Sequence, residues 1–467
     1  MRTTPHEEHE TRRIILLRGK IPEVLLGVHG THCTLPEVQI PRWQRVAEHL
    51  TATVSDTFGI HGVLLSSLDV PTAEPGSQQI CYEIMELFGP QNETPGEKEW
   101  MAADGLGESV FRDPCDFQAL RQAIEQSMAQ PEDISHGPFG KLGWFLDLQQ
   151  WVQEQIRACG LHLNGRFRQL NACPTFSLIR FETDGPAVWF KAVGAPNQRE
   201  YPLTLALARL FPRFLPQIIA TRPEWNGWIA LEAEGLLLRE CSTLASWGPV
   251  ARDLAELQSH ALGRGLHLLD LGARDLRART LADLVEPFFQ IMGELMERQT
   301  KMPPAPLSRE ELRCLSTQIQ DSLGVLEETN VPSTLGHLDI NPGNIICSSI
   351  GCLFLDWAEA FVGHPFLTFE YLLEHFRRTF PHDQLQETHL VARYSYPWHA
   401  FVSENDIRRV LEVAPLVAVF ACAVGNDLWT NPRKLEDPRS AGYLRSLTRR
   451  MQREARELME RSVLCRS

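Results

Sequence analysis

The chain carries one short polar segment, HLDINPGN, which is followed closely by an apolar run and a further acid. The segment contains His337, Asp339 and Asn344, and the apolar run Cys352 to Leu355 leads directly into Asp356. The apolar run predicts a strand that ends at Asp356, and the polar segment before it predicts a loop. Two acids and an asparagine at such a position are typical of phosphoryl-transfer chemistry.

The residues between the first acid and the asparagine favour a tight loop. Pro342 fixes one backbone angle and Gly343 permits unusual ones, so a carboxylate and an amide oxygen can share a single turn. Magnesium takes oxygen ligands and needs few from the protein, so one asparagine and one aspartate suffice. Each residue alone could equally cap a turn or end a strand, but together they predict Asp339 as the base and Asn344 with Asp356 as metal ligands.

The pattern H-x-D-x4-N followed by L-D-W resembles the loop of the aminoglycoside phosphotransferase and choline kinase superfamily. The resemblance extends over about residues 165–430. It implies an α+β, protein-kinase-like fold of two lobes, with a small antiparallel sheet before a helical lobe, and it implies ATP and Mg2+ as cofactors. It also makes His337 part of the catalytic loop, where we expect it to support the loop through hydrogen bonds. Most relatives have a small residue where this chain has Leu338, a difference that removes no functional group.

A lysine within a predicted strand suits the nucleotide's phosphates. The run AVWFKAV places Lys191 among apolar neighbours, where an ammonium group is costly to bury unless it meets an anion. The alternative is a lysine that faces water from the sheet edge. We expect Lys191 to hold the α- and β-phosphates and Glu200, at the start of the next helix, to pair with it. Glu200 would also suit a helix N-terminus without any ion pair.

Two further segments complete the expected nucleotide site. The phosphate loop of the resembling family falls on Cys173–Thr175, which contains no glycine, so backbone amides near Thr175 and Ser177 would have to reach the phosphate. After the predicted strand WIALE, the segment Ala233–Gly235 corresponds to the connection between the lobes, and adenine would bind to backbone atoms around Glu234.

The first 135 residues resemble a Nudix domain, with predicted strands, a helix and further strands in a small α/β arrangement. A Nudix hydrolase presents several glutamates to magnesium from that helix. Here Ala52 and Thr53 stand where an Arg-Glu pair belongs, and Asp56 alone cannot build the metal site. We therefore expect a Nudix-like domain that is inactive as a hydrolase and that supports the structure or recognises a substrate or partner.

These expectations divide the chain into four parts. They are a Nudix-like domain at 1–135, a linker and connecting helix at 136–165, a kinase-like N-lobe at 166–235 and a helical C-lobe at 236–467. The polar stretch at 130–141 is the expected linker.

Composition limits the partners. The 467 residues hold 45 lysines and arginines against 59 acids, a net charge of −14, which disfavours nucleic acid as a partner. The apolar stretch Val413 to Gly425 is too short for a spanning helix, so we expect a buried core helix and no membrane association. The 11 cysteines include no CxxC pair, Cys347 and Cys352 being the closest, and predict reduced thiols in a cytoplasmic protein.

The sequence therefore predicts a small-molecule kinase that transfers the γ-phosphoryl group of ATP to a hydroxyl of an acceptor which the sequence leaves unnamed, as it does the oligomeric state. One alternative is a pseudokinase that senses nucleotide or a metabolite without transfer, which the glycine-free phosphate loop favours and the intact Asp339, Asn344 and Asp356 oppose. A second alternative makes residues 1–135 a genuine hydrolase of nucleoside diphosphate derivatives.

Overall fold

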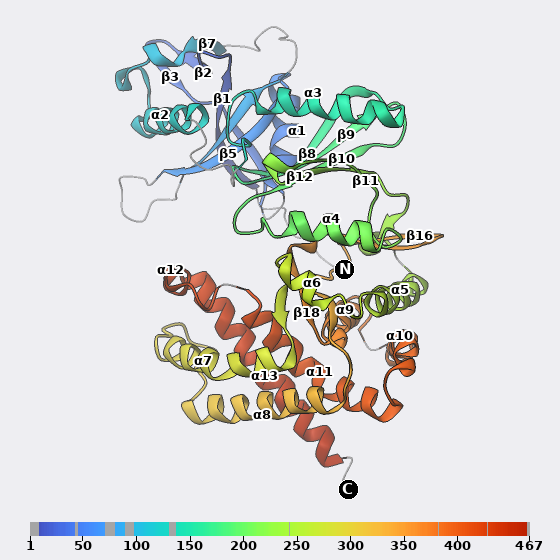
Figure 1. The fold of residues 1–467 in the computed structure, drawn as a ribbon. Coiled ribbons are helices and arrows are strands. Elements are labelled where there is room, and N and C mark those ends of the chain that lie inside the picture. Colours follow the sequence, from blue (N-terminus) through green and yellow to red (C-terminus); the bar gives the residue numbers. More distant parts are fainter. Residues whose placement is uncertain are drawn as a thin grey trace, which may run out of the picture. The chain divides into compact units, whose positions relative to one another are not determined.

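A computed structural model describes residues 9–42, 45–70, 80–88, 98–129, 137–241, 243–381, 383–426 and 428–464 (Figure 1). The chain forms two compact units. The first contains Met1–Tyr201 and Gln217–Glu232, and the second contains Pro202–Pro216 and Ala233–Ser467. The sheet expected as the kinase-like N-lobe thus lies in the same unit as the N-terminal region.

Among the described residues, the first unit has two sheets and three α-helices of its own. The strands of the N-terminal sheet are β1 (His9–Arg18), β2 (Glu23–His29), β3 (His32–Thr34), β4 (Glu37–Pro41), β5 (Gly62–Val70), β6 (Ile80–Leu87) and β7 (Lys98–Ala102). Those of the second sheet are β8 (Leu163–Cys173), β9 (Phe176–Thr183), β10 (Val188–Val193), β11 (Ile218–Arg222) and β12 (Gly227–Leu231). The helices are α1 (Val46–Phe58), α2 (Pro114–Met128) and α3 (Trp144–Ile156), and α4 (Glu200–Leu210) begins in this unit and ends in the second.

The N-terminal sheet is mixed and is covered on both faces. Its main order is β3-β2-β1-β6-β5, with β1 and β6 parallel, while β4 pairs with β1 and β7 with β2. Ile14 and Leu16 face the core that contains α1, whereas Ile15 and Leu17 face a second core. A strand buried on both faces needs a continuous apolar run, which explains RIILL in β1. Two short strands, β3 and β4, lie between β2 and α1, so the expected order of strand, strand, helix was incomplete.

The second sheet is antiparallel, as expected for the small sheet that precedes the helical lobe. Its order is β11-β12-β10-β9-β8, and all of its pairs are antiparallel. Its buried face shares one core with the N-terminal sheet and α3. The amide of Gln169 adds a polar link, because its Nε2 donates to the carbonyl of Leu64 at 2.9 Å and its Oε1 accepts from the Leu64 N–H at 2.8 Å. The two sheets are therefore joined through a common interior. Of the linker expected at 130–141, residues 130–136 lie outside the described part.

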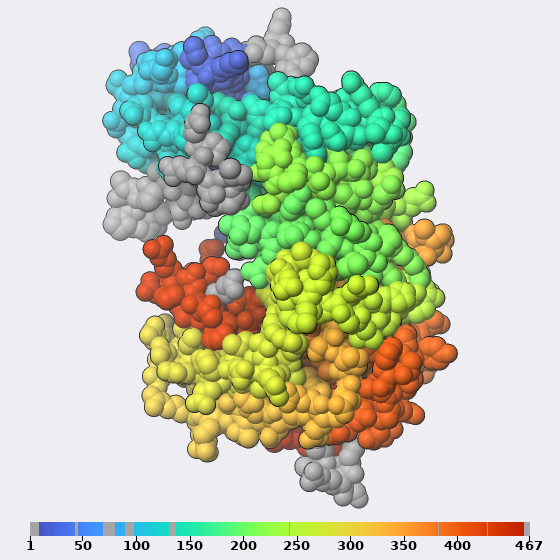
Figure 2. Space-filling view, viewed as in Figure 1, coloured from blue at the N-terminus to red at the C-terminus, as the bar shows by residue number. Residues whose placement is uncertain are grey.

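The second unit is mostly helical. Its helices are α5 (Trp247–His260), α6 (Gly265–Asp270), α7 (Ala278–Glu297), α8 (Arg309–Glu328), α9 (Pro365–Thr379), α10 (Gln384–Ser395), α11 (Glu404–Val424), α12 (Pro432–Glu436) and α13 (Pro438–Leu464). Its strands are β13 (Leu236–Leu237), β14 (Arg274–Leu276), β15 (Thr334–His337), β16 (Ile345–Ser348), β17 (Gly351–Phe354) and β18 (Ala360–Gly363), which form the sheets β13-β16-β17 and β14-β18-β15. The helices α7 and α8 lie side by side on the surface of this unit, in yellow in Figure 2.

Local sequence signals explain how several of these helices begin. Ser308 and Glu311 form a capping box at the start of α8, and Pro365 occupies the first position of α9, where a proline costs no hydrogen bond. The expected core helix around Val413 is α11, which is largely buried. Within the part of the chain that the structure describes, we find no helix with the length and apolar character needed to span a membrane.

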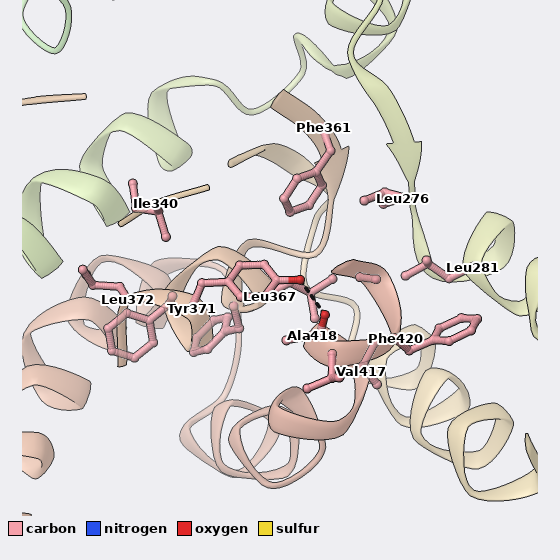
Figure 3. Close-up of a cluster of buried hydrophobic side chains, with 14 of the residues drawn as sticks. Leu276, Leu281, Ile340, Phe361, Leu367, Tyr371, Leu372, Val417, Ala418 and Phe420 are labelled. Atoms are coloured by element: carbon pink, nitrogen blue, oxygen red, sulfur yellow. Dashed lines mark hydrogen bonds between the residues drawn. The ribbon is translucent and has the colours of Figure 1, made fainter. Parts of the chain in front are cut away.

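The hydrophobic core of the second unit includes a residue of the polar loop between β15 and β16. Ile340, inside that loop, is buried in the same cluster as residues of α9 and α11 (Figure 3). Tyr371 of α9 donates a hydrogen bond of 2.5 Å to the carbonyl of Ala418 in α11, which satisfies its buried hydroxyl. The loop between β15 and β16 is thus anchored by an apolar side chain in a packed interior.

Candidate active site

The backbone of Leu355 connects the polar loop to the strand end that precedes Asp356. Its N–H donates to the carbonyl of Asn344 at 2.8 Å, and its carbonyl accepts from Nε2 of His337 at 2.9 Å. Nδ1 of His337 in turn accepts from the N–H of Asp339 at 3.1 Å. These bonds fix a neutral imidazole with its proton on Nε2. His337 is buried, and its ring packs on Trp357 with centroids 4.8 Å apart, so it contacts the residues on both sides of Asp356.

The carboxylate of Asp339 is exposed and oriented by two asparagines. Its Oδ1 accepts from Nδ2 of Asn341 at 2.8 Å, and its Oδ2 accepts from Nδ2 of Asn344 at 3.0 Å. Asn341 also closes the turn, because its Oδ1 accepts from the N–H of Gly343 at 2.8 Å. A carboxylate in this position can receive a proton from a bound hydroxyl.

Asn344 and Asp356 lie at the same end of the β16–β17 hairpin. The strand register pairs Ile345 with Phe354, and the hydrogen bond between Asn344 and Leu355 extends the ladder by one residue. Asp356 then leaves the hairpin with a φ of 63°, a left-handed conformation that an L-residue with a short polar side chain tolerates. This turn separates the exposed Asp356 from the buried Trp357 that follows.

The donor set at this end of the hairpin suits magnesium. The Nδ2 of Asn344 donates to both the carbonyl and the carboxylate of Asp339, each at 3.0 Å, so Oδ1 is the amide atom that could bind a metal. With the exposed carboxylate of Asp356, it would provide two hard oxygen donors and leave room for water and phosphate oxygens. Among the described residues no cluster of three or more His, Cys, Asp or Glu side chains forms a metal site.

Lys191 and Glu200 form the predicted ion pair in the first unit. Nζ of Lys191 lies 2.5 Å from Oε1 of Glu200, and their side chains are 14% and 2% exposed. The ammonium group also lies over the rings of Phe176 and Trp228, at 5.7 and 5.9 Å from the centroids. Glu200 is the first residue of α4, so the same carboxylate makes the ion pair and stands in the favoured first turn.

The segment expected as the phosphate loop is a two-residue turn. Pro174 and Thr175 connect β8 to β9, and the carbonyl of Thr175 accepts from the N–H of Gly194 at 2.6 Å. Ser177 pairs with Ala192 in the neighbouring strand, while Lys191 pairs with Leu178. Because adjacent residues of a strand face opposite sides, the side chain of Ser177 points away from Lys191, into the core. The predicted role of Ser177 concerned its backbone amide and stays a prediction.

The chain leaves the first unit at the segment expected to connect the lobes. The boundary falls between Glu232 and Ala233, and Glu234 is exposed in the loop that follows. Glu232 accepts from Arg180 through both carboxylate oxygens, at 2.6 and 2.8 Å, and from Nε1 of Trp189 at 3.2 Å. The hydrogen bond from Arg180 lowers the pKa of Glu232, so this carboxylate stays charged. The segment that follows therefore starts at a residue held by three side-chain hydrogen bonds.

Sequence reasoning missed two residues beside the loop. Asn341 was not singled out, although an asparagine before Pro-Gly is a known turn signal that would have marked it. Burial lowers the pKa of His375 in α9, and the charge of Asp339 is one of the influences that oppose this shift. No sequence spacing relates α9 to the loop, so only the fold could reveal His375.

Comparison with known proteins finds a family match in sequence and, among solved structures, matches with low sequence identity. No curated protein matches the chain. Among solved structures, an ethanolamine kinase of Plasmodium vivax is similar at 13% identity and a TM-score of 0.43, over 76% of this chain and 92% of that one. A choline kinase of Cryptosporidium parvum is similar at 12% identity and a TM-score of 0.48, over 68% and 98%.

A spectinomycin phosphotransferase in complex with ADP and spectinomycin is similar at 11% identity and a TM-score of 0.41, over 65% of this chain and 98% of that one. The match in sequence includes the polar loop between β15 and β16. Residues 196–401 of the chain, which contain Glu200, Asp339, Asn344 and Asp356, match the phosphotransferase enzyme family.

Proposed function

We propose that the protein is a magnesium- and ATP-dependent kinase of a small molecule, which transfers the γ-phosphoryl group to a hydroxyl of its acceptor. The observation that carries the proposal is a pair of hydrogen bonds made by the backbone of Leu355. They connect His337 and Asn344 to the residue directly before Asp356. The match of residues 196–401 to the phosphotransferase enzyme family supports it independently.

Each side chain has a role that follows from its contacts. Asp339 orients the acceptor hydroxyl and takes its proton, because its carboxylate is exposed and aligned by Asn341 and Asn344. Asn344 and Asp356 provide the oxygen ligands for magnesium, which, when bound, neutralises charge on the phosphates. Lys191 is positioned by Glu200 to contact the nucleotide's phosphates. Because the transition state is loose, positioning and charge supply most of the catalysis.

An acceptor panel tests this function. The full chain would be incubated with ATP and magnesium against amino alcohols, aminoglycosides, macrolides and sugars, and ADP release would be followed. We expect release that requires one acceptor class and magnesium. Magnesium-dependent binding of ATP without release across the whole panel would instead support the nucleotide-sensing pseudokinase, which the glycine-free turn at Pro174 and Thr175 favours.

We also propose that the N-terminal sheet is a Nudix-like domain without hydrolase activity. In α1, Asp56 is exposed, but Ala52 and Thr53 supply no carboxylate beside it. The sheet shares its core with the second sheet, so we infer a supporting role for it. The test is pyrophosphatase activity on nucleoside diphosphate derivatives, measured on the full chain, since cutting at residue 135 would open that core. Magnesium-dependent hydrolysis that is unchanged in Asp339→Asn would refute the supporting role.

A further inference from the structure

Three cysteines that the proposed catalysis does not use gather at the β16–β17 hairpin. Cys347 of β16 and Cys352 of β17 are direct partners across the two antiparallel strands. Cys241 follows β13, the strand that pairs with β16 on its other side, and its thiol lies near that of Cys347. All three thiols are free. The sequence showed Cys347 and Cys352 only as neighbours in a chain without CxxC pairs.

The backbone places Cys347 and Cys352 where a cross-strand disulfide fits. In an antiparallel ladder, hydrogen-bonded and non-hydrogen-bonded pairs alternate. Leu355 and Asn344 form a hydrogen-bonded pair, so counting along the hairpin makes Cys347 and Cys352 a non-hydrogen-bonded pair. The N–H of Cys352 agrees, since it points outward and donates to Oδ2 of Asp253 at 2.9 Å.

Pairs of this kind have their Cα atoms about 4.5 Å apart, which falls within the roughly 4.4 to 6.8 Å that a disulfide requires. The two side chains also lie on the same face of the hairpin, because the residues are directly opposite each other in the antiparallel pair. A bond between Cys347 and Cys352 can therefore form without moving the strands. This distinguishes the pair from cysteines that a disulfide could join only after backbone rearrangement.

The surroundings give the two thiols different roles. Cys347 is partly exposed, while Cys352 is buried. The hydrogen bond from Cys352 lowers the pKa of the Cys347 thiol, and a second hydrogen bond from Cys241 lowers it further, against the effect of burial. The thiolate is the attacking species, so the accessible Cys347 is the one that meets a reagent first. The neighbouring Cys347 thiol, burial and the charge of Asp253 together raise the pKa of the Cys352 thiol, so Cys347 is the first of the pair to react.

We propose that Cys347 and Cys352 form a reversible modification site for small disulfides of the glutathione type. The Cys347 thiolate attacks one sulfur of the small disulfide, forms a mixed disulfide and releases one small thiolate. Cys352 then loses its proton, attacks the sulfur of Cys347 and releases the second small thiolate. The protein dithiol is oxidised by two electrons and the small disulfide is reduced to two thiols, so atoms and electrons balance.

The site lies on the element that presents the proposed metal ligands. Cys347 and Cys352 are three pairs along the hairpin from Asn344 and Leu355. The bond would tie together the two strands whose far ends carry Asn344 and Asp356. The modification itself depends only on the hairpin and stands whether or not the protein is a kinase.

Peptide mapping tests the proposal on the full chain. The reduced protein would be treated with oxidised glutathione, its remaining thiols blocked, and the product cut after glutamate. Cleavage at Glu328 and Glu359 gives a peptide in which Cys347 and Cys352 are the only cysteines. We expect this peptide to lose two hydrogens and to accept no blocking group, and a small dithiol to restore both thiols.

Two variants separate the steps, and a third serves as the control. Cys352→Ser should stop at the mixed disulfide, with one glutathione on Cys347, and Cys347→Ser should leave the peptide without glutathione. Cys314→Ser removes an exposed cysteine elsewhere and should change nothing. A wild-type peptide that keeps both thiols, retains one glutathione, or is instead joined to Cys241 would overturn the proposal. Because Cys352→Ser and the wild-type protein give independent answers, misfolding of Cys347→Ser would not affect the test.

Discussion

The carbonyl of Leu355 accepts a hydrogen bond of 2.9 Å from Nε2 of His337, across 18 residues of sequence. This bond connects the end of β15 to the residue before Asp356. The other ring nitrogen of His337 is occupied by the N–H of Asp339. His337 therefore acts on the site by positioning two backbone segments, and its imidazole has no free nitrogen for proton transfer.

Replacing His337 by alanine should destabilise the second unit and disturb both segments. We expect His337→Ala to lower the free energy of unfolding by about 2 to 4 kcal/mol, because a buried ring and two hydrogen bonds are lost. Chemical denaturation of the full chain measures this. His267→Ala, which removes an exposed ring in α6, is the matched control and should change stability little. Equal stability of the two variants would contradict the positioning role.

Removing either proposed metal ligand should weaken magnesium dependence. We expect Asp356→Asn and Asn344→Ala to raise the magnesium concentration for half-maximal ADP release by more than about tenfold, since even outer partners of a metal site have effects of that size. Asp321→Asn neutralises an exposed carboxylate of α8 and provides the control. A magnesium titration of each variant measures this concentration. Unshifted curves for both ligand variants would show that this end of the hairpin does not bind the magnesium.

Breaking the ion pair from the lysine side should cost stability as well as nucleotide binding. Lys191→Ala leaves Glu200, whose side chain is 2% exposed, without its cation, and should destabilise the first unit by about 3 to 5 kcal/mol. The KM for ATP should rise as well. Lys20→Ala, in an exposed turn, should affect neither quantity. If unfolding and the KM for ATP were both unchanged in Lys191→Ala, the pair would have no role in folding or binding.

A carboxylate outside the site should give the first unit a pH dependence. Burial raises the pKa of Glu86 from 4.5 to about 7, although the N–H of Gly143 donates to it at 2.8 Å. The folded state then holds an extra proton between these values, so stability should fall as pH rises from 4.5 to about 7. The steepest slope should be about 1.4 kcal/mol per pH unit.

Urea denaturation across this pH range would compare the wild-type protein with Glu86→Gln, in which the slope attributed to this group should disappear. Glu125→Gln, on the exposed side of α2, should keep the wild-type profile. Matching profiles for wild type and Glu86→Gln would show that Glu86 is charged throughout the range.

Much of the fold followed from periodicity and turn chemistry. The strands around Lys191 and the helix α8 were predictable because alternating or helical apolar spacing agrees with local capping signals. The short strands β3 and β4 were missed, since three to five residues beside a turn carry too little pattern. The common core of the two sheets was also beyond prediction, because Gln169 and Leu64 meet only through long-range packing.

The site was predictable where its parts are close in sequence. Asp339, Asn344 and Asp356 fall within one hairpin and its loop, so their spacing alone brings them together. His375 comes from α9, a helix far from the loop in sequence, and its position near Asp339 depends on the fold. The disulfide geometry of Cys347 and Cys352 needed the register, since a shift by one residue would have turned the two thiols to opposite faces.

The most direct test of the account is turnover and nucleotide affinity measured side by side in Asp339→Asn. Once the panel has identified an acceptor, we expect this variant to release ADP about 100- to 10,000-fold more slowly than the wild type, because it cannot take the hydroxyl's proton. Its affinity for ATP with magnesium should stay within about twofold of the wild type, since Asn344 and Asp356 remain. Wild-type turnover in Asp339→Asn would contradict the central claim.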